Sequence, residues 1–325
     1  MIKNNFSKKI TRPKFLERLK IINLRDDIMK IKPIFILGTA RSGTTNLSNH
    51  IAQHSKIFGM LSKEHWGIKE HRLFKWQYYF GDLNSEESLF FFVENFSQSD
   101  FFSLSGITKD SLYKFHPKNI FDVFYVIINE VEMRNKYKYI LFNNPHQTFY
   151  LEELIKIFPD AYFISIRRPV DQIVKSKIKM WGEKSLYQMA NSVFNSQLDF
   201  GYLDKNINKI NNILEIKFED VINYPKEAYR KILNFLHLDW EDAILDNPYK
   251  INSSFGDLES KKSFFTNEDK MFVSFCDTLF NFIPYDIKKI FGLWLDKKSV
   301  KSSKFPDFKY RLHPCSTFMK GDKFN

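Results

Sequence analysis

Short apolar runs and amphipathic segments alternate along most of this chain. Residues 34–37 are all apolar, and Leu47, Ile51 and Ala52 recur at helical spacing shortly after them. A continuous apolar run is typical of a parallel strand buried on both faces, whereas recurrence every three to four residues is typical of a helix with one apolar face. The segment from Pro33 to Ala52 therefore predicts a strand, a turn and a helix.

The same alternation returns three times farther along the chain. Apolar runs that predict strands begin at Tyr139, Tyr162 and Ile213. The segments with helical periodicity are 151–158, 171–180, 186–203 and 228–236. Strands that alternate with helices are typical of a parallel sheet with helices on both faces. We therefore expect an α/β protein with three layers, α/β/α, around a central parallel sheet.

The segment between these regions is harder to interpret. Residues 72–135 are rich in aromatic side chains and have weak helical periodicity, including one predicted helix from Phe121 to Asn135. Aromatic faces can stack on a sugar or enclose an apolar acceptor, but they more often belong to a protein core. We favour the core, and we expect substrate choice to depend on this region.

The two ends of the chain differ from its middle. Residues 1–31 are basic with a helical rhythm, which predicts an N-terminal extension helix. Residues 297–325 are basic, and Pro306 and Pro314 favour an irregular tail over a long helix. Because no linker composition separates the parts, we expect a single domain over 1–325.

Composition and charge narrow the class of protein. Of the 325 residues, 43% are apolar, which is typical of a folded chain, and the net charge is +11. The lysines are scattered, so overall bias explains this charge better than a nucleic-acid surface, and we expect no nucleic-acid partner. Cys276 and Cys315 lie far apart, which argues against a disulfide framework or a zinc site. The chain has no apolar run of membrane-spanning length and no signal-peptide pattern, so we expect a cytoplasmic protein.

The turn after the first predicted strand has the spacing of a phosphate-binding loop. Gly38, Gly43 and Thr45 match G-x-x-x-x-G-K-[ST], but Thr44 stands at the lysine position. That lysine normally reaches the β- and γ-phosphates, whereas backbone N–H groups and a helix N-terminus bind the remaining phosphate. Arg41 adds a permanent charge. This P-loop-like turn predicts a site for a nucleotide without a γ-phosphate, and a chance glycine turn is the alternative.

The turn resembles the 5′-phosphosulfate loop of sulfotransferases that use 3′-phosphoadenosine 5′-phosphosulfate (PAPS), in the branch with Arg-Ser-Gly-Thr-Thr. The resemblance implies transfer of a sulfuryl group to an acceptor hydroxyl, with 3′,5′-ADP (PAP) as product and no metal. It also implies a set of donor-binding residues in the loop: Gly38, Thr39, Ala40, Arg41, Ser42, Gly43, Thr44 and Thr45.

A second segment resembles the 3′-phosphate site of the same family. Arg167, Arg168 and Pro169 follow the strand that begins at Tyr162, and Ser176 lies in the next helix. In the family an Arg at the strand end and a Ser about eight residues later bind the 3′-phosphate, and Arg is suited to this by its bidentate geometry. Counting from the proline favours Arg167, and counting from Ser176 favours Arg168. We assign Arg167 and Ser176, with Arg168 as the alternative.

The resemblance also implies a general base after the first helix. Glu64 matches the family's glutamate, which accepts the proton that an acceptor hydroxyl loses as it attacks sulfur. His65 and His71 are neighbouring candidates for the same role, and a solvated glutamate in a polar loop is the alternative. Arg41 is expected to stabilise charge on the leaving group.

The chain departs from the family at one position. Relatives commonly have a lysine just before a proline at the end of the second core strand, where this chain has Asn143 and Asn144 before Pro145. Either an asparagine amide makes a weaker contact, or Arg41 or Lys63 supplies the charge. A loop with Lys261 and Lys262 is a further candidate for closing over the donor, although a solvated pair of charges is the better interpretation.

Three functions remain open from the sequence. Sulfuryl transfer from PAPS, with a carbohydrate or small-molecule acceptor, is the first. A kinase-like P-loop phosphotransferase is the second, and Thr44 in place of lysine opposes it. A non-catalytic nucleotide-binding protein is the third, and Asn143 and Asn144 favour it. Carbohydrate is preferred because the segment Glu64–Trp66 resembles glycan-modifying relatives, and the oligomeric state is left open.

Overall fold

The structure is a computed structural model that describes residues 30–62, 67–71, 73–74, 80, 82–181, 184–246, 249 and 265–302. All the helices and strands described below belong to the compact unit Ile31–Asn325. The predicted extension helix at 1–31 falls almost entirely outside the described residues, as does the tail beyond residue 302. The single-domain organisation therefore stays a prediction.

A parallel sheet forms the centre of the molecule. Its strands follow the order β2-β3-β1-β4-β5, and every neighbouring pair is parallel. They are β1 (Lys32–Leu37), β2 (Ile57–Gly59), β3 (Tyr139–Asn143), β4 (Tyr162–Arg167) and β5 (Ile213–Lys217). In register, Ile34 of β1 lies between Leu141 of β3 and Tyr162 of β4. The carboxyl ends of β1, β3 and β4 therefore meet at one edge, where open α/β sheets bind ligands.

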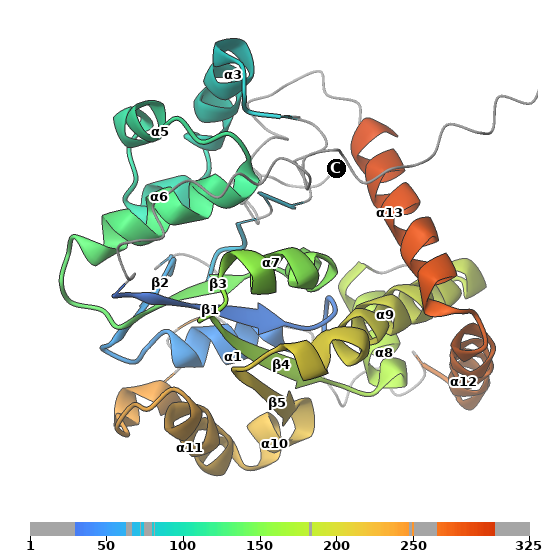
Figure 1. Ribbon diagram of the computed structural model, residues 1–325. Helices are drawn as coiled ribbons and strands as arrows, with labels where there is room; N and C mark the ends of the chain where they lie inside the picture. Colours follow the sequence, from blue (N-terminus) through green and yellow to red (C-terminus); the bar gives the residue numbers. More distant parts are fainter. Residues whose placement is uncertain are drawn as a thin grey trace, which may run out of the picture. The chain divides into compact units, whose positions relative to one another are not determined.

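Helices cover both faces of this sheet (Figure 1), so the predicted α/β fold class is confirmed. On one face lie α1 (Thr44–Ile51), α10 (Phe218–Asn223) and α11 (Pro225–Phe235). On the other lie α6 (Ile120–Glu132) and α7 (Leu151–Ile157). Beyond β4 follow α8 (Val170–Trp181), α9 (Leu186–Asn206), α12 (Asn267–Asn281) and α13 (Tyr285–Ser302). The remaining elements are α3 (Glu86–Phe96), α4 (Asp100–Ser105), α5 (Lys109–Phe115), η3 (Pro145–Tyr150), η4 (Ile207–Lys209) and η5 (Asp242–Leu245).

The two faces of the sheet have different cores. Toward α6, the ring of Phe35 stacks on Phe142 and Phe163, with centroids 5.4 and 5.6 Å apart, and meets Phe124 edge-on. Toward α1 and α11, aliphatic side chains such as Ile34 and Ile36 pack instead. Successive strand residues point to opposite faces, so a strand buried on both sides must be apolar throughout. This requirement explains why apolar runs in the sequence predicted the positions of the strands.

The aromatic segment before β3 is largely core, as predicted. Phe92, Phe96 and Phe101 are fully buried, whereas Phe90 is exposed. The helix predicted from Phe121 is α6, which begins at Ile120 because the side chain of Asn119 accepts hydrogen bonds from the first turn. The described rings of this segment that are buried therefore stabilise the fold.

Three elements differ from the sequence-based expectation. Strand β2 has only three residues, too few to produce a periodic signal. Helix α10 begins at Phe218, directly after β5, although Phe218 continues the alternation of apolar residues that begins at Ile213. Helix α13 continues to Ser302, past the predicted start of the tail at Lys297, because Pro306 is the first residue there that breaks a helix.

Candidate phosphate-binding site

The loop between β1 and α1 has room only for glycine at its two ends. At Gly43 the backbone φ is +108°, and an added Cβ would lie 2.6 Å from a ring carbon of Phe218. At Gly38 an added Cβ would lie 2.7 Å from the hydroxyl oxygen of Ser42 and 3.0 Å from the carbonyl oxygen of Ile166. Both glycines allow the loop to fold tightly against β4 and α10, as the spacing predicted.

The start of α1 is open to an anion. Gly43 caps the helix without a side-chain hydrogen bond, and no acidic residue lies in the first turn. The first N–H groups of a helix have no intrahelical partner and carry a partial positive charge, so an anion at this end is stabilised. Thr44 and Thr45 begin the helix, and Thr39 accepts a hydrogen bond from Ser42 N at 3.0 Å inside the loop.

Ser42 has a buried hydroxyl that no described group satisfies. The residue is fully buried, and its Oγ has no hydrogen-bond partner among the residues that the structure describes. Buried polar atoms are almost always paired, so an unpaired one inside a glycine loop is typical of a ligand site. Ala40, by contrast, is partly exposed at the turn.

Arg41 joins the loop to α8. Its Nε donates to the Oγ of Ser176 at 3.1 Å, across 135 residues of sequence. The backbone φ of Arg41 is +76°, a conformation that a non-glycine residue adopts at a cost of about 1–3 kcal/mol. Burial lowers the pKa of Arg41 from its usual value, and the charge of Glu70 opposes this. The structure therefore brings together two of the predicted phosphate-binding residues.

Arg168 also lies beside the loop. Its Nη1 donates to the carbonyl oxygen of Arg41 at 3.1 Å, and its guanidinium lies 4.1 Å from the centroid of the Phe218 ring. Burial and the neighbouring charge of Arg41 lower the pKa of Arg168 to about 10, although Glu219 and Asp171 oppose them. The guanidinium remains charged at neutral pH.

Arg167 has different partners. Its Nε donates to Glu215 at 2.5 Å, and its Nη2 forms an ion pair with Asp204. Burial lowers the pKa of Arg167, but the hydrogen bonds that it donates to Asp204 and Glu215, together with their negative charges, outweigh this effect, and the pKa is raised overall. The loop therefore has Arg168, rather than Arg167, as its neighbour in this structure.

Glu64 and His65 lie outside the described residues, as do Lys63, Lys261 and Lys262, so their predicted roles stay predictions. The segment that follows is described. The charge of Glu70 acts on Arg41, which places a second carboxylate near the loop.

His71 has a structural environment. It is fully buried among aromatic rings, its Nδ1 accepts a hydrogen bond from Leu73 N at 3.3 Å, and its Nε2 lies 3.2 Å from Gln147 Oε1. With Nδ1 as acceptor, Nε2 carries the proton and donates to Gln147. These contacts keep the imidazole of His71 buried, and none of them exposes it to an acceptor substrate.

The end of β3 carries a second unsatisfied polar group. Asn143 is fully buried, and neither its Nδ2 nor its Oδ1 has a hydrogen-bond partner in the described part of the chain. Asn144 is also fully buried. Asn143 pairs in register with Ile36, at the same sheet edge as the loop. Its amide can both donate and accept, so it is suited to a neutral polar contact with a ligand.

Sequence reasoning missed two residues that shape this site. Thr148 Oγ1 accepts a hydrogen bond from Gly38 N at 3.2 Å and ties η3 to the loop. Lys177 is buried beside Ser176 on α8. No sequence signal marks Thr148, and Lys177 stands in a run of alternating lysines that is typical of a solvated helix face.

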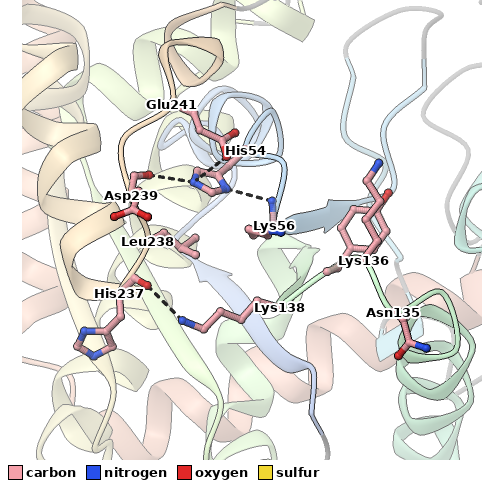
Figure 2. A pocket seen from close by; sticks show the side chains of 10 residues that line it. His54, Lys56, Asn135, Lys136, Lys138, His237, Leu238, Asp239 and Glu241 are labelled. Atoms are coloured by element: carbon pink, nitrogen blue, oxygen red, sulfur yellow. Dashed lines mark hydrogen bonds and ion pairs between the residues drawn. The ribbon is translucent and has the colours of Figure 1, made fainter.

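A cavity of about 450 Å³ lies elsewhere, at the amino ends of β2 and β3 (Figure 2). Two of its polar side chains contact protein groups: Lys138 Nζ donates to the His237 carbonyl oxygen at 3.1 Å, and Glu241 contacts His54. Parallel sheets bind ligands at their carboxyl ends, so this cavity does not belong to the phosphate site.

Among the described residues, no three His, Cys, Asp or Glu side chains are grouped to hold a metal ion. No helix there combines the length and apolar character needed to cross a bilayer.

Comparison with known proteins gives a match to one protein family. The profile of the Sulfotransferase family matches residues 33–242, more than half of the chain. This range contains the loop, Arg168 and Ser176, and ends before α12.

Two curated relatives are protein-tyrosine sulfotransferases. The chain is 28% identical over 109 residues to that of Drosophila melanogaster, covering 32% of this chain and 22% of the relative. It is 26% identical over 141 residues to protein-tyrosine sulfotransferase 1 of Danio rerio, covering 42% of this chain and 39% of the relative. The matched segments thus span less than half the length of these relatives.

Solved sulfotransferase structures are also similar. The sulfotransferase domain from the Synechococcus PCC 7002 olefin synthase has a TM-score of 0.47 and 15% identity, over 86% of this chain and 98% of that one. A sulfotransferase from Mycobacterium tuberculosis H37Rv has a TM-score of 0.43 and 14% identity, over 69% and 72%. Both TM-scores lie below 0.5. The assignment of the phosphate-binding site rests on the contacts within this chain and not on these two structures.

Proposed function

The chain belongs to the sulfotransferase family, and we propose that it transfers a sulfuryl group from PAPS to an acceptor hydroxyl, leaving 3′,5′-ADP. The observation that carries this proposal is the hydrogen bond from Arg41 to Ser176 at 3.1 Å. It links a loop suited to a 5′-phosphosulfate with the segment that resembles a 3′-phosphate site. A donor with phosphate groups at both positions needs both segments close together.

The loop fits the anionic end of this donor. The two glycines leave no room for side chains, and the start of α1 carries no acidic residue. The hydroxyl of Ser42 has no hydrogen-bond partner in the part of the chain that the structure describes. Thr44 replaces the lysine that serves a γ-phosphate, which favours a nucleotide without one over ATP. When bound, PAPS supplies the activated sulfuryl group. We assign its 5′-phosphosulfate to residues 38–45.

We assign the 3′-phosphate to Arg168 and Ser176. Arg168 lies next to the loop, whereas the carboxylates of Glu215 and Asp204 hold the guanidinium of Arg167. The sequence-based preference for Arg167 is the competing assignment, and variants of the two arginines distinguish them.

The chain's own groups supply proton transfer and charge stabilisation. We propose that Glu64 accepts the proton of the acceptor hydroxyl, because a carboxylate within hydrogen-bond reach is suited to this task. His65 is its neighbour in this role. Glu70 is the second carboxylate, since its charge already acts on Arg41. Arg41 and the start of α1 stabilise the negative charge left on the donor phosphate.

The acceptor is proposed as a class only. The resemblance to glycan-modifying enzymes favours a carbohydrate hydroxyl, whereas two relatives are named for protein tyrosine. A phenol has a pKa near 10 and needs less help from a base than a sugar alcohol. An acceptor panel that contains both kinds of hydroxyl separates these possibilities.

The test is transfer of radiolabelled sulfuryl from PAPS to that panel. We expect wild-type turnover without added ATP, and a Glu64→Gln variant that binds 3′,5′-ADP normally but has lost turnover. A Glu64→Gln variant with full turnover, beside an inactive Glu70→Gln variant, would move the base to Glu70. Absence of transfer to every acceptor, despite binding of 3′,5′-ADP, would favour the non-catalytic nucleotide-binding alternative that Asn143 and Asn144 raise.

A further inference from the structure

Helix α12 presents an apolar stripe to the solvent. Its opposite face contains Val273 and Cys276, which are buried against side chains of α8 and α9. Along the outer face, apolar side chains recur every three or four residues, the spacing that places them on one side of a helix. They are exposed by 49–81% and run from the first turns to the end of the helix: Met271, Phe275, Leu279 and Phe282.

Helix α13 continues this apolar surface beyond a short turn (Figure 1). Phe194 of α9 meets Phe280 of α12 and Phe291 of α13 edge-on, so both helices flank the same ring. Phe282 lies in the turn between the helices, and the two stripes adjoin there. The exposed apolar residues of α13 again share one helical face: Ile287, Ile290, Phe291 and Trp294.

The α12–α13 surface, defined by these eight exposed side chains, is larger than the apolar patches that soluble monomers usually carry. A large side chain can bury ~150–250 Å², so eight of them exposed by 39–81% present roughly 800 Å². The largest patch on a typical monomer measures ~300–600 Å², and a stable interface buries about 800 Å² of each partner. The surface is therefore large enough for a complete protein–protein interface.

The charges at the ends of this surface favour a protein partner over an anionic bilayer. The first turn of α12 is acidic: Glu268 is exposed, and Asp269 pairs with Lys184. Anionic lipids repel such a turn, since they attract apolar stripes that are flanked by basic residues. The sequence of the last turns of α13 is basic instead, with Lys297, Lys298 and Lys301. One copy of the chain thus has an acidic and a basic end, which a second copy complements.

One antiparallel register matches both the apolar residues and the charged ends of two copies. When α12 of one copy packs against α13 of the other in the opposite direction, facing positions have a constant sum of residue numbers. With Phe275 opposite Phe291, Leu279 faces Ile287, and position 271 comes within one residue of Trp294. The same register brings position 268 opposite position 298, so the acidic turn meets the basic one. A two-fold axis repeats all these contacts with the copies exchanged.

We propose that the α12–α13 surface is the interface of a homodimer, in which α12 of each copy packs antiparallel on α13 of the other. Burial of the eight apolar side chains drives the association, and the charged ends select the register. The inference is independent of the proposed function, because both helices lie beyond residue 242, where the family match ends.

The first test is the mass of the full chain in solution, measured by sedimentation velocity at ~10 µM. We expect a dimer for the wild type. Phe275→Asp and Phe282→Asp should each weaken association about 100-fold or more, because a charge buried without a partner in an interface is costly. Phe90→Asp is the matched control: Phe90 is 59% exposed on α3, and its variant should remain a dimer.

The second test examines the register by cysteine cross-linking, in a chain whose own Cys276 and Cys315 are replaced by alanine and serine. Phe275→Cys and Phe291→Cys are prepared as two proteins that carry tags of different mass. Mild oxidation should join them when they are mixed, since the two positions face each other across the interface. Neither protein alone should form a covalent dimer, because position 275 of one copy does not face position 275 of the other.

The outcomes separate this proposal from its competitors. A monomeric wild type, or a dimer that persists in both Asp variants, would overturn it. Cross-linking of Phe275→Cys with itself, but not with Phe291→Cys, would overturn the pairing of α12 with α13. A monomer that binds vesicles of phosphatidylcholine with phosphatidylglycerol, and that loses this binding in Phe275→Asp but not in Phe90→Asp, would assign the surface to a membrane instead. Binding of 3′,5′-ADP should be equal in the wild type and the three Asp variants, so its failure would affect only the donor assignment.

Discussion

Arg167 and Arg168 are neighbours in sequence but contact different parts of the molecule. Arg168 donates to the loop carbonyl of Arg41, whereas Arg167 contacts Glu215 of β5 and Asp204 of α9. Side chains of successive residues near a strand end point in opposite directions, so a shift of one position changes the role completely. Sequence spacing alone could not decide between them.

The first prediction separates the two arginines. Arg168→Ala should weaken binding of 3′,5′-ADP by ~1.5–3 kcal/mol, about 10- to 100-fold, because it removes charge-assisted hydrogen bonds to a phosphate. Arg167→Ala should change affinity little and stability by ~1 kcal/mol or less, since its ion pairs are partly exposed. Calorimetric titration measures both. The reverse pattern would restore the sequence-based assignment of Arg167.

A second prediction concerns Gly43. Replacement by alanine should destabilise the fold by ~1–3 kcal/mol, because φ is +108° and the new methyl group would meet Phe218 at 2.6 Å. Gly201→Ala is a matched control in the middle of α9, where the new methyl meets only Tyr285, at 3.1 Å. Urea unfolding measures both. Equal stabilities of the two variants would contradict the tight loop described here.

At the scale of elements, the loop is held by segments distant in sequence. Gly38 N donates to Thr148 of η3, Arg41 donates to Ser176 of α8, and Gly43 packs on Phe218 of α10. The strand–turn–helix unit was predictable from its apolar run, its glycines and its helical periodicity. Its supports were not, because a side chain that reaches across 110 or more residues leaves no local pattern.

A third prediction tests one of these supports. Thr148→Val keeps the shape of the side chain but leaves the buried Gly38 N–H without an acceptor, which should cost ~1–3 kcal/mol of stability. Thr148→Ser keeps the hydroxyl and should lose much less. Chemical denaturation of the two variants measures the difference. A Val variant as stable as the Ser variant would mean that this hydrogen bond does not hold the loop.

The whole molecule carries a net charge of +11, and the structure shows that part of its positive charge is buried near the loop. The fold class followed from the alternation of strands and helices, because buried parallel strands must be apolar. The burial of Lys177 did not follow, since only the packing of α9 against α8 places that side chain inside. The predicted base Glu64 lies outside the described residues and stays a prediction.

A fourth prediction follows for stability and pH. The pKa of Lys177 is lowered from 10.5 to about 8, so between these values the unfolded chain binds more protons than the folded one. The contribution of Lys177 to stability should therefore be unfavourable by ~3 kcal/mol below pH 8 and disappear as the pH rises toward 10.5. Lys177→Met should accordingly stabilise the ligand-free protein at pH 7, and much less near pH 10. Thermal unfolding at the two pH values measures this, and equal effects at both would contradict a buried, titrating lysine.

The most direct test of the central claim is a thermal-shift titration of the wild type and Arg168→Ala with 3′,5′-ADP. A ligand that binds only the folded state stabilises it by ~2.7 kcal/mol at a hundred times its dissociation constant. We predict a clear shift for the wild type, and for Arg168→Ala a stabilisation reduced to about half or less at the same concentration. No shift with 3′,5′-ADP, together with a shift by ATP–Mg²⁺, would contradict the PAPS assignment and favour a kinase-like phosphotransferase.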